Sequence, residues 1–346
     1  MTCCDFSARP ADVRRILAVT TGGLGDAILF SPVLKALRSR YPLARIELLL
    51  ASRLAEIAFA KANDIDRTIV TNMNHLLFPL NAKELVYFAF KSRKNGGFDM
   101  GVFATGLNRK LSYFLKPIAG IREVVSGPTP PTYATDLACN VALARRFDNS
   151  ISEGDAFVPL TEESKREAKE QLEKHDILWD EEKIIAVYPS TELWHRPRWE
   201  LSKLAQVLNL FRKDGFQGKI VVVGSPVEGK EWADTGVNGL VDANLAGKLS
   251  ILGSASLISK CCLVIGNDGG LMHVAGALGT PLVVVMTNPP LSYRPPGQKT
   301  KVVHSNVSCC DSLYPKRPKS CRSAKCKDDI TVEEVFQACV NMISSR

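Results

Sequence analysis

Short apolar runs alternate with amphipathic stretches along the chain, which is the pattern of parallel α/β units. Residues 15–19 are an apolar run that ends at a glycine-rich turn, 26–40 follow a helical pattern, and 44–50 return to strand character. A strand, turn, helix and second strand in this order predict a right-handed βαβ unit. A further strand at 100–104 and a helix within 109–117 continue the alternation.

The same alternation restarts after a very polar helical stretch at 162–175. The pattern there predicts the strands 183–188, 219–223, 263–266 and 281–286 and the helices 200–212, 250–260 and 270–278. Thr331 and Glu334 have the spacing of a capping box, which predicts a C-terminal helix through Met342.

We therefore expect two Rossmann-like parallel-sheet domains of similar size, over residues 1–160 and 161–330, with the linker near 150–182. Residues 331–346 are expected to form a helix that packs back toward the N-terminal domain. Two such domains predict a ligand in the cleft between them.

The composition excludes several classes of protein. The chain has 346 residues, of which 45% are hydrophobic and 23% charged, and this balance argues against disordered, fibrous or membrane-embedded proteins. No apolar run approaches the roughly 18 residues of a spanning helix, and the N-terminus lacks the apolar core of a signal peptide. We expect a cytoplasmic protein whose ten cysteines are reduced thiols.

The formal charge is +8, from 44 Lys and Arg against 36 Asp and Glu. Two stretches concentrate the basic residues, 91–94 and 316–327, and we interpret both as solvated loops. Such an excess suits phosphorylated small molecules, anionic membranes or nucleic acid alike. Neither stretch shows the interleaved aromatics of a single-strand binding platform, and no recognition module accompanies them, so we expect no nucleic acid.

A first motif, TTGGLGD, joins the first strand to the first helix. Gly22, Gly23 and Gly25 let the backbone turn tightly and let a ligand approach. Their spacing is not the dinucleotide fingerprint, and no Lys-Ser/Thr pair follows, which argues against nicotinamide and ATP-hydrolysis chemistry. Asp26 is either a plain first-turn acid, whose charge the helix dipole favours, or a carboxylate placed to accept a proton.

A second motif, GNDGGLMH at 266–273, again lies between a strand and a helix. Backbone N–H groups at such a turn, together with the helix dipole, form a phosphate site. Asp268 is suited to fix the loop or to hold a sugar hydroxyl. His273 is either a packed core histidine or a substrate contact.

A third motif follows the strand 183–188. The hydroxyls of Ser190 and Thr191 and the guanidinium groups of Arg196 and Arg198 could clamp a diphosphate. The alternative is an ordinary loop that leads into the next helix.

Two long segments carry a resemblance to a known family. The segment TTGGLGDAILFSPVLKALRSRYPLARI resembles the N-terminal signature of glycosyltransferase family nine, the ADP-heptose:lipopolysaccharide heptosyltransferases. The segment NLAGKLSILGSASLISKCCLVIGNDGGLMHVAGALGTPLVVV is similar to the second-domain signature of that family, and the likeness spans most of residues 14–288. The resemblance implies a GT-B fold, with the acceptor bound by the N-terminal domain and the nucleotide sugar by the C-terminal one.

The resemblance also implies the reaction. It would be inverting transfer of a heptose from ADP-heptose to a lipopolysaccharide inner-core acceptor of the lipid A–Kdo type, with no catalytic metal or other cofactor. Asp26 matches the general base of the family and Asp268 the acid at the sugar site. The positions that match phosphate and sugar contacts are Gly269, Gly270, Leu271, Ser190 and Thr191.

The sequence departs from the family pattern at three places. Gly269 stands where the family usually has a threonine, and no lysine lies near Trp194, where Arg196 or Arg198 is the candidate substitute. The turn after the last strand of the second domain also differs. These changes keep open another nucleotide sugar, a protein acceptor, or a catalytically weak scaffold that retains the fold.

Four cysteines cluster near the C-terminus, Cys309, Cys310, Cys321 and Cys326. Four thiols could hold a metal ion, but an adjacent pair is an awkward tetrahedral chelate compared with a CxxC spacing. The basic residues beside them could instead contact phosphorylated core sugars or the inner face of the inner membrane, which would make the enzyme peripheral there.

Overall fold

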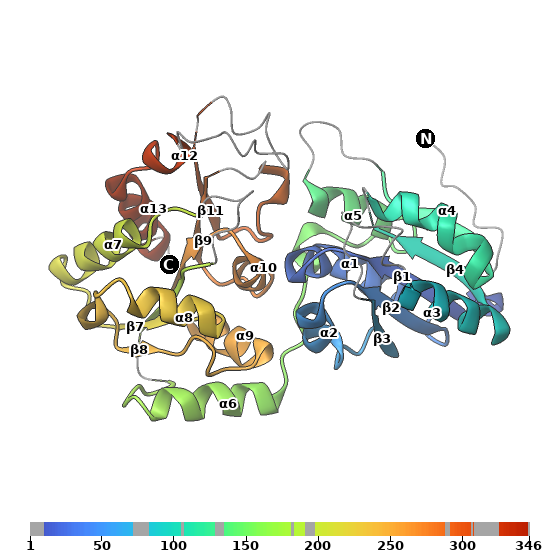
Figure 1. Cartoon of the computed structure of the whole chain (residues 1–346), viewed down its shortest axis with the longest axis horizontal. Coiled ribbons are helices and arrows are strands. Elements are labelled where there is room, and N and C mark those ends of the chain that lie inside the picture. Colours follow the sequence, from blue (N-terminus) through green and yellow to red (C-terminus); the bar gives the residue numbers. More distant parts are fainter. Residues whose placement is uncertain are drawn as a thin grey trace. The chain divides into compact units, whose positions relative to one another are not determined.

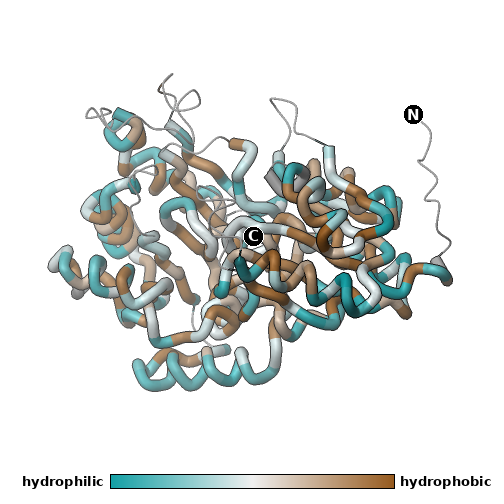
Figure 2. The backbone as a smooth tube through the Cα atoms, turned by 45° about the vertical axis from the view of Figure 1, so that its right-hand side comes forward, coloured by the Kyte–Doolittle hydropathy of each residue, from teal (hydrophilic) through white to brown (hydrophobic). Residues whose placement is uncertain are grey.

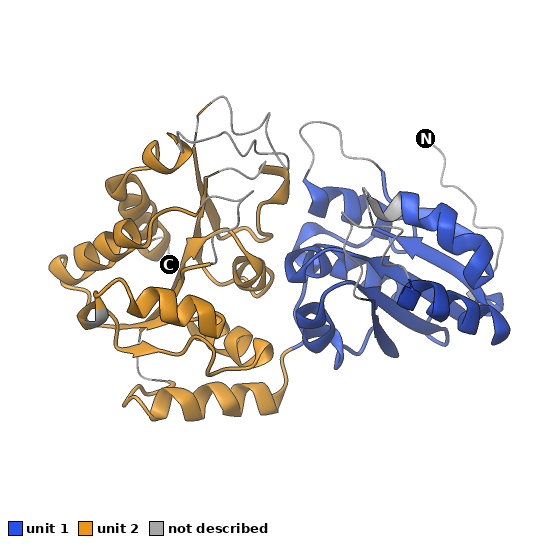
Figure 3. Ribbon diagram, in the orientation of Figure 1, with its two compact units in different colours: residues 1–159 blue, residues 160–346 orange. Residues whose placement is uncertain are grey.

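The chain forms two compact units, residues 1–159 and 160–346 (Figure 3). The computed structural model describes residues 10–71, 83–104, 107–128, 135–180, 183–190, 198–287, 291–305, 307 and 325–344. Each unit is a parallel sheet with helices, so the predicted α/β fold class is confirmed.

Unit 1 is built on a five-stranded parallel sheet in the order β3-β2-β1-β4-β5 (Figure 1). Its strands are β1 (Arg15–Thr20), β2 (Arg45–Leu50), β3 (Arg67–Val70), β4 (Phe98–Phe103) and β5 (Ile121–Ser126). Its helices are α1 (Leu24–Arg40), α2 (Arg53–Phe59), α3 (Lys83–Lys94), α4 (Leu107–Ala119) and α5 (Asp136–Ala144). The strand order reverses beside β1, and ligands of such sheets bind at the carboxyl ends of the strands where that reversal occurs.

Helices α3 and α4 cover one face of this sheet. Leu85 and Ala89 of α3 and Leu111 and Leu115 of α4 share one buried cluster with Leu17 of β1. Because a parallel crossover is right-handed, the reversal of strand order places α1 on the opposite face, where it packs against α5.

The basic stretch 91–94 is not the solvated loop that we predicted. Lys91, Arg93 and Lys94 form the last turn of α3, where positive side chains interact favourably with the helix dipole. The stretch 316–324, which holds most of the second basic cluster, lies outside the described residues.

Unit 2 is built on a six-stranded parallel sheet in the order β11-β10-β9-β6-β7-β8. Its strands are β6 (Ile184–Tyr188), β7 (Lys219–Val222), β8 (Ala243–Asn244), β9 (Leu263–Asn267), β10 (Leu282–Met286) and β11 (Thr300–His304). Its helices are α6 (Glu162–Glu173), α7 (Leu201–Lys213), α8 (Pro226–Ala233), α9 (Ile251–Lys260), α10 (Gly270–Ala277), α12 (Lys325–Asp328) and α13 (Val332–Ser344).

The polar helix α6 belongs to unit 2 although it falls inside the predicted linker. Figure 2 shows it as a mostly hydrophilic tube, but a narrow stripe with Ala168 and Leu172 is buried. The hydroxyl groups of Ser164 and Ser256 lie 2.8 Å apart and join α6 to α9. A helix with so few apolar residues is stable here because that stripe packs on a neighbour.

The C-terminal helix α13 contributes its buried side chains to the core of unit 2. Val335, Ala338 and Cys339 share a cluster with residues of the central strands, and the rings of Phe336 and Phe211 meet edge to face at 5.2 Å. The hydroxyl of Thr331 accepts a hydrogen bond from the Glu334 N–H at 3.1 Å, as the capping spacing predicts. Within unit 2, α13 contacts α7 and the strands β9, β10 and β11, and packing of residues 331–346 toward the N-terminal domain stays a prediction.

The described cysteines are thiols, and burial raises the pKa of the Cys339 thiol well above its usual range. They are Cys139, Cys261, Cys262, Cys326 and Cys339. Within the described ranges, no helix is both long and apolar enough to cross a membrane.

Candidate active site

The first candidate residue, Asp26, lies in the opening turn of α1, directly after the carboxyl end of β1. Gly23 is the N-cap residue, and its N–H donates to Oδ2 of Asp26 at 2.8 Å. The Asp26 side chain is exposed, whereas the two threonines before the turn are buried. The structure therefore shows the first-turn capping role and also leaves the carboxylate accessible to a ligand.

Gly22 is required for this placement of the carboxylate. A Cβ atom at position 22 would lie 2.1 Å from Cγ of Asp26 and 2.2 Å from its Oδ2. Any side chain at position 22 would push the Asp26 carboxylate away. Gly25 follows within the first turn of α1, so all three predicted glycines lie around Asp26.

The second candidate turn lies in unit 2, between β9 and α10. Asp268 follows the strand, and Gly269 is the N-cap of the helix. Asp268, Gly269 and Gly270 are half-buried, while Leu271 and His273 are buried. The turn therefore exposes backbone at the helix N-terminus, where an anion is favoured.

Ser190 connects the loop after β6 to this turn. Its hydroxyl donates to the backbone oxygen of Asp268 at 2.9 Å, and its φ of 57° is a left-handed conformation that non-glycine residues rarely adopt. Arg198 donates to the backbone oxygen of Ser190 at 2.7 Å and forms an ion pair with Glu231. Arg198 thus holds the Ser190 loop, a role that the third motif did not predict.

Asn267 also positions this turn, a role that the sequence motifs did not predict. Its buried amide accepts from the Trp199 N–H at 2.7 Å and donates to the backbone oxygens of Pro189 and Trp199 at 2.9 and 3.2 Å. One side chain thereby ties β9 to both ends of the loop after β6. A buried asparagine at the end of an apolar strand was the available signal, because buried amides need partners.

Tyr188 fills the space beside Gly269. A Cβ atom at position 269 would lie 2.7 Å from Cε1 of Tyr188, 2.8 Å from its hydroxyl and 3.1 Å from Oγ of Ser190. Burial and the neighbouring Glu228 carboxylate raise the pKa of the Tyr188 hydroxyl far above its usual range, so the phenol stays neutral. Gly269, where the sequence lacks the threonine hydroxyl of the family pattern, is therefore flanked by the hydroxyls of Tyr188 and Ser190.

The structure brings Ser190, Arg198, Asp268 and Gly269 together at one end of the unit 2 sheet. Thr191 and Arg196 lie outside the described residues, as do Cys309, Cys310 and Cys321. The fourth cysteine of that cluster, Cys326, is a buried thiol on α12. Within the described part of the chain, His, Cys, Asp and Glu side chains form no group of three that could hold a metal ion.

Comparison with known sequences decides the family. The sequence profile of "Glycosyltransferase family 9 (heptosyltransferase)" matches residues 137–325, more than half of the chain and including the β9–α10 turn. The chain belongs to this family. It is a glycosyltransferase.

Named relatives of family 9 cover both units. The lipooligosaccharide heptosyltransferase 2 of Haemophilus influenzae is 26% identical over 313 residues, which are 81% of this chain and 85% of that protein. The lipopolysaccharide heptosyltransferase 2 of Salmonella typhimurium is 24% identical over 316 residues, 81% of this chain and 86% of that protein.

Solved structures of family 9 share the fold. A family 9 glycosyltransferase of Veillonella parvula superimposes with a TM-score of 0.76 at 20% identity, covering 96% of this chain and 98% of that one. The E. coli ADP-heptose lps heptosyltransferase II has a TM-score of 0.69 at 19% identity, covering 96% and 99%. The GT-B-type fold that the sequence resemblance implied is thereby confirmed.

Proposed function

We propose that this glycosyltransferase moves a heptose from ADP-heptose to a hydroxyl of a lipid A–Kdo type inner-core acceptor, with inversion at the anomeric carbon. The observation that carries the proposal is the exposed Asp26 carboxylate, which the Gly22–Gly23 turn holds at the carboxyl end of β1. The names of the relatives, which are heptosyltransferases of lipopolysaccharide and lipooligosaccharide, support the donor and the acceptor class. We also propose that the enzyme works in the cytoplasm.

In this proposal Asp26 is the general base of unit 1. The acceptor oxygen attacks the anomeric carbon from the face opposite the diphosphate, the bond to the ADP oxygen breaks, and ADP departs with the bonding pair. The acceptor proton passes to the Asp26 carboxylate. The Gly23 N–H already binds Oδ2 of Asp26, which fixes the carboxylate before the acceptor arrives.

The donor belongs to the β9–α10 turn of unit 2. The backbone N–H groups of Gly269, Gly270 and Leu271 would meet the diphosphate at the helix N-terminus. Ser190 and Thr191 would add hydroxyl contacts, and Asp268 would accept from a sugar hydroxyl. His273 is buried one turn into α10. We therefore propose that it stabilises the helix that binds the donor and does not contact the sugar itself.

The leaving diphosphate needs positive charge, and we propose that the α10 dipole and Arg196 supply it without a catalytic metal. Arg198 contributes through the loop, because its guanidinium binds the Ser190 carbonyl and Glu231. The hydroxyls of Tyr188 and Ser190 stand beside Gly269, where the family pattern has a threonine. We propose that they take over the polar contact of that threonine.

Product analysis tests the proposal. Purified protein is given ADP-heptose and a de-acylated lipid A–Kdo acceptor, with and without EDTA. We expect an acceptor heavier by one heptosyl residue, one ADP released per product, an inverted anomeric configuration by NMR, and the same rate with EDTA. Donor binding without any product would contradict the proposed acceptor. Transfer from another nucleotide sugar alone would contradict ADP-heptose as the donor. A lower rate with EDTA would contradict the metal-free mechanism.

The rival scaffold function rests on the departures from the family pattern at Gly269 and near Trp194. It predicts that neither ADP-heptose nor another nucleotide sugar is turned over. The intact Asp26 turn favours the enzyme, because a scaffold has no need of an exposed carboxylate on a turn that only glycine fits.

A further inference from the structure

Three aromatic side chains stand in solvent on one helical layer of unit 1. Tyr87 and Phe90 on α3 are 70% and 55% exposed, and Tyr113 on α4 is 72% exposed. Every other Phe, Tyr or Trp whose burial the structure describes is buried or half-buried. Exposed aromatics that gather on two neighbouring helices form a patch, whereas singly scattered ones would need no explanation.

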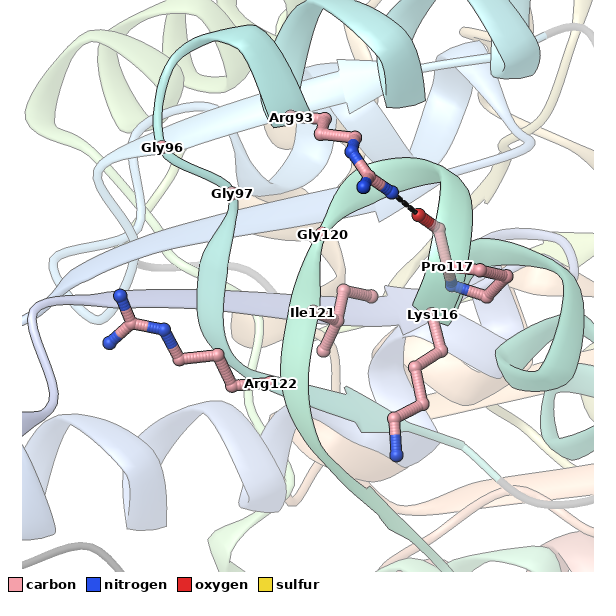
Figure 4. Close-up of a pocket in the computed structure, with 8 residues that line it drawn as sticks. All are labelled: Arg93, Gly96, Gly97, Lys116, Pro117, Gly120, Ile121 and Arg122. Carbon is pink, nitrogen blue, oxygen red and sulfur yellow. Dashed lines mark hydrogen bonds between the residues drawn. The ribbon is translucent and has the colours of Figure 1, made fainter.

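Phe90 on α3 and Tyr113 on α4 lie at matching heights, and Tyr87 lies one turn before Phe90 on the same side of α3. Both helices return antiparallel to the strands that they connect, so they run side by side in the same direction. The Arg93 guanidinium donates to the Pro117 carbonyl, which fixes their register (Figure 4). Phe90 lies one turn before Arg93, and Tyr113 lies one turn before Pro117, so both rings project from the same level of the layer.

Positive charge surrounds the aromatics. The exposed lysines of the two helices are Lys83, Lys91, Lys94, Lys110 and Lys116. The segment 83–123 holds eight Lys or Arg and three Asp or Glu, a formal charge of +5 out of +8 for the whole chain. The Lys91 ammonium lies 6.0 Å from the centre of the Tyr87 ring, so charge and ring belong to one surface.

A basic pocket opens at the C-terminal ends of the same helices. It has a volume of about 520 Å³, and its charged lining residues are Arg93, Lys116 and Arg122 (Figure 4). Arg122 is paired with Asp99 at 2.9 Å, but Lys116 has no hydrogen-bond or ion-pair partner within the described residues. The pocket lies where β4 and β5 begin. It is therefore at the amino ends of the parallel strands, whereas Asp26 lies at their carboxyl ends.

We propose that the outward face of α3 and α4 docks unit 1 on an anionic phospholipid bilayer. Aromatic rings favour the headgroup level of a bilayer, and each lysine near an anionic surface strengthens binding about fivefold. The face takes lipid phosphates on Lys91, Lys94 and Lys116 while Tyr87, Phe90 and Tyr113 enter the interface. This face is distinct from the basic stretch 316–327, which was the membrane contact that the sequence suggested.

Two other occupants fit the face less well. A second copy of this chain, docked face to face, would bring together two segments that each carry a formal charge of +5. Single-stranded nucleic acid would match the charge, but its bases stack within grooves, and these rings project from the outward sides of helices. The reason for docking, a lipid-linked acceptor, rests on the proposed function, whereas binding to vesicles is measured without either substrate.

Vesicle flotation of the full chain tests the proposal. The probe is vesicles of phosphatidylethanolamine with phosphatidylglycerol, compared with vesicles of phosphatidylcholine alone. The charge variant is K91E/K94E/K116E, and the aromatic variant is Y87S/F90S/Y113S. The matched controls, on exposed residues outside α3 and α4, are K213E/K248E/K301E and L43S/L54S/V227S.

We expect the wild-type chain to bind the anionic vesicles and not the phosphatidylcholine ones. The charge variant should bind at least about 100-fold more weakly, and the aromatic variant about tenfold more weakly. Both controls should stay within about threefold of wild type, and salt at about 0.5 M should weaken wild-type binding. All variants should keep the wild-type turnover on a soluble, de-acylated acceptor, so failure of docking and failure of the proposed function are distinguishable.

Several results would overturn the docking surface. Equal binding by wild type and both face variants would place membrane contact elsewhere, and equal losses in the controls would make the effect one of general charge or hydrophobicity. Absence of vesicle binding would also reject it. In that case an oligonucleotide that binds only the wild-type face would assign it to nucleic acid, and a dimer dispersed by the variants would assign it to a second copy.

Discussion

The turns at the start of α1 and of α10 share one architecture but place their acids differently. Each turn follows the carboxyl end of a buried parallel strand and begins its helix with a glycine N-cap, Gly23 or Gly269. Asp26 lies three residues after its cap and accepts the Gly23 N–H. Asp268 lies immediately before its cap, and its backbone oxygen is held by Ser190.

This difference teaches how one local design serves two kinds of chemistry. A carboxylate at the third helical position occupies the N-terminus itself and is held there, ready to accept a proton. A glycine cap preceded by the acid leaves backbone at the helix N-terminus for an anion. The two turns also differ in support, since a buried amide and a buried phenol surround the second one whereas the first is exposed.

The largest expected effect on stability concerns the buried support of the second turn. Asn267→Ala removes three hydrogen bonds and leaves buried backbone groups of Pro189 and Trp199 without partners. We expect the free energy of unfolding to fall by about 3 kcal/mol, measured by urea denaturation. The exposed Asn341→Ala should cost less than about 0.5 kcal/mol, and a cost below about 1 kcal/mol for Asn267→Ala would show that its amide does not hold the turn.

Next in size is the glycine beneath Asp26. Gly22→Ala puts a methyl group where the carboxylate lies, and the exposed Asp26 side chain can move away at little cost in stability. We expect kcat to fall about 100-fold while the free energy of unfolding changes by less than about 1 kcal/mol. Gly239→Ala, whose Cβ would meet nothing within 4 Å, should change neither quantity. Unchanged turnover in Gly22→Ala would mean that the position of the carboxylate is not critical.

The corresponding change in unit 2 should act on stability instead. Gly269→Ala places a methyl group 2.7 Å from the ring of Tyr188, which is buried and cannot swing out. We expect a loss of about 2 kcal/mol in the free energy of unfolding and weaker ADP binding by calorimetry. In a Tyr188→Leu background the same change should cost at least about 1 kcal/mol less, and strict additivity of the two changes would contradict the contact.

The smallest expected effect concerns Asp155, a unit 1 aspartate that caps its helical turn as Asp26 does but has no proposed catalytic role. Asp155, like Asp26, is the third residue of its helical turn and accepts the N-cap N–H at 2.8 Å, here from Ser152. The hydrogen bond from Lys35 and that N–H lower the pKa of Asp155 below its usual value. A lowered folded pKa stabilises the protein above the unfolded pKa of about 4, and the contribution is lost as the pH falls through the folded value.

Asp155→Asn should therefore lower the free energy of unfolding by less than about 1 kcal/mol at pH 7. The difference in this free energy between the variant and wild type should shrink below about pH 4. Urea denaturation of both proteins across that range measures the difference. A difference that grows on acidification would reverse the sign of the linkage.

The apolar pattern of the sequence predicted the elements in which that pattern is long and clean. The strand at 15–19 and the helix at 26–40 correspond to β1 and α1 within two residues, and the terminal helix corresponds to α13. It missed β3 and β8, which have only four and two residues, and also the longer strands β5 and β11. It also missed α3, because Tyr87 and Phe90 place apolar residues on the outward side and blur the helical period.

The candidate site was predictable where it follows from local spacing. Both glycine turns could be located because each lies between a strand and a helix pattern. The supports from distant segments could not be, since Asn267 acts on Trp199 and Arg198 acts on Glu231 only after the chain has folded. Whether Cys326 and its three partners hold a metal ion stays a prediction.

The most direct test of the account is acceptor-dependent ADP release by wild type, Asp26→Asn and Asp155→Asn. The asparagine at position 26 keeps an oxygen for the Gly23 N–H but loses the charge that takes the proton. We expect Asp26→Asn to release ADP about 1,000-fold more slowly with unchanged ADP binding, and Asp155→Asn, matched in its capping role, to equal wild type. Equal release by Asp26→Asn and wild type would contradict the assignment of Asp26 as the base.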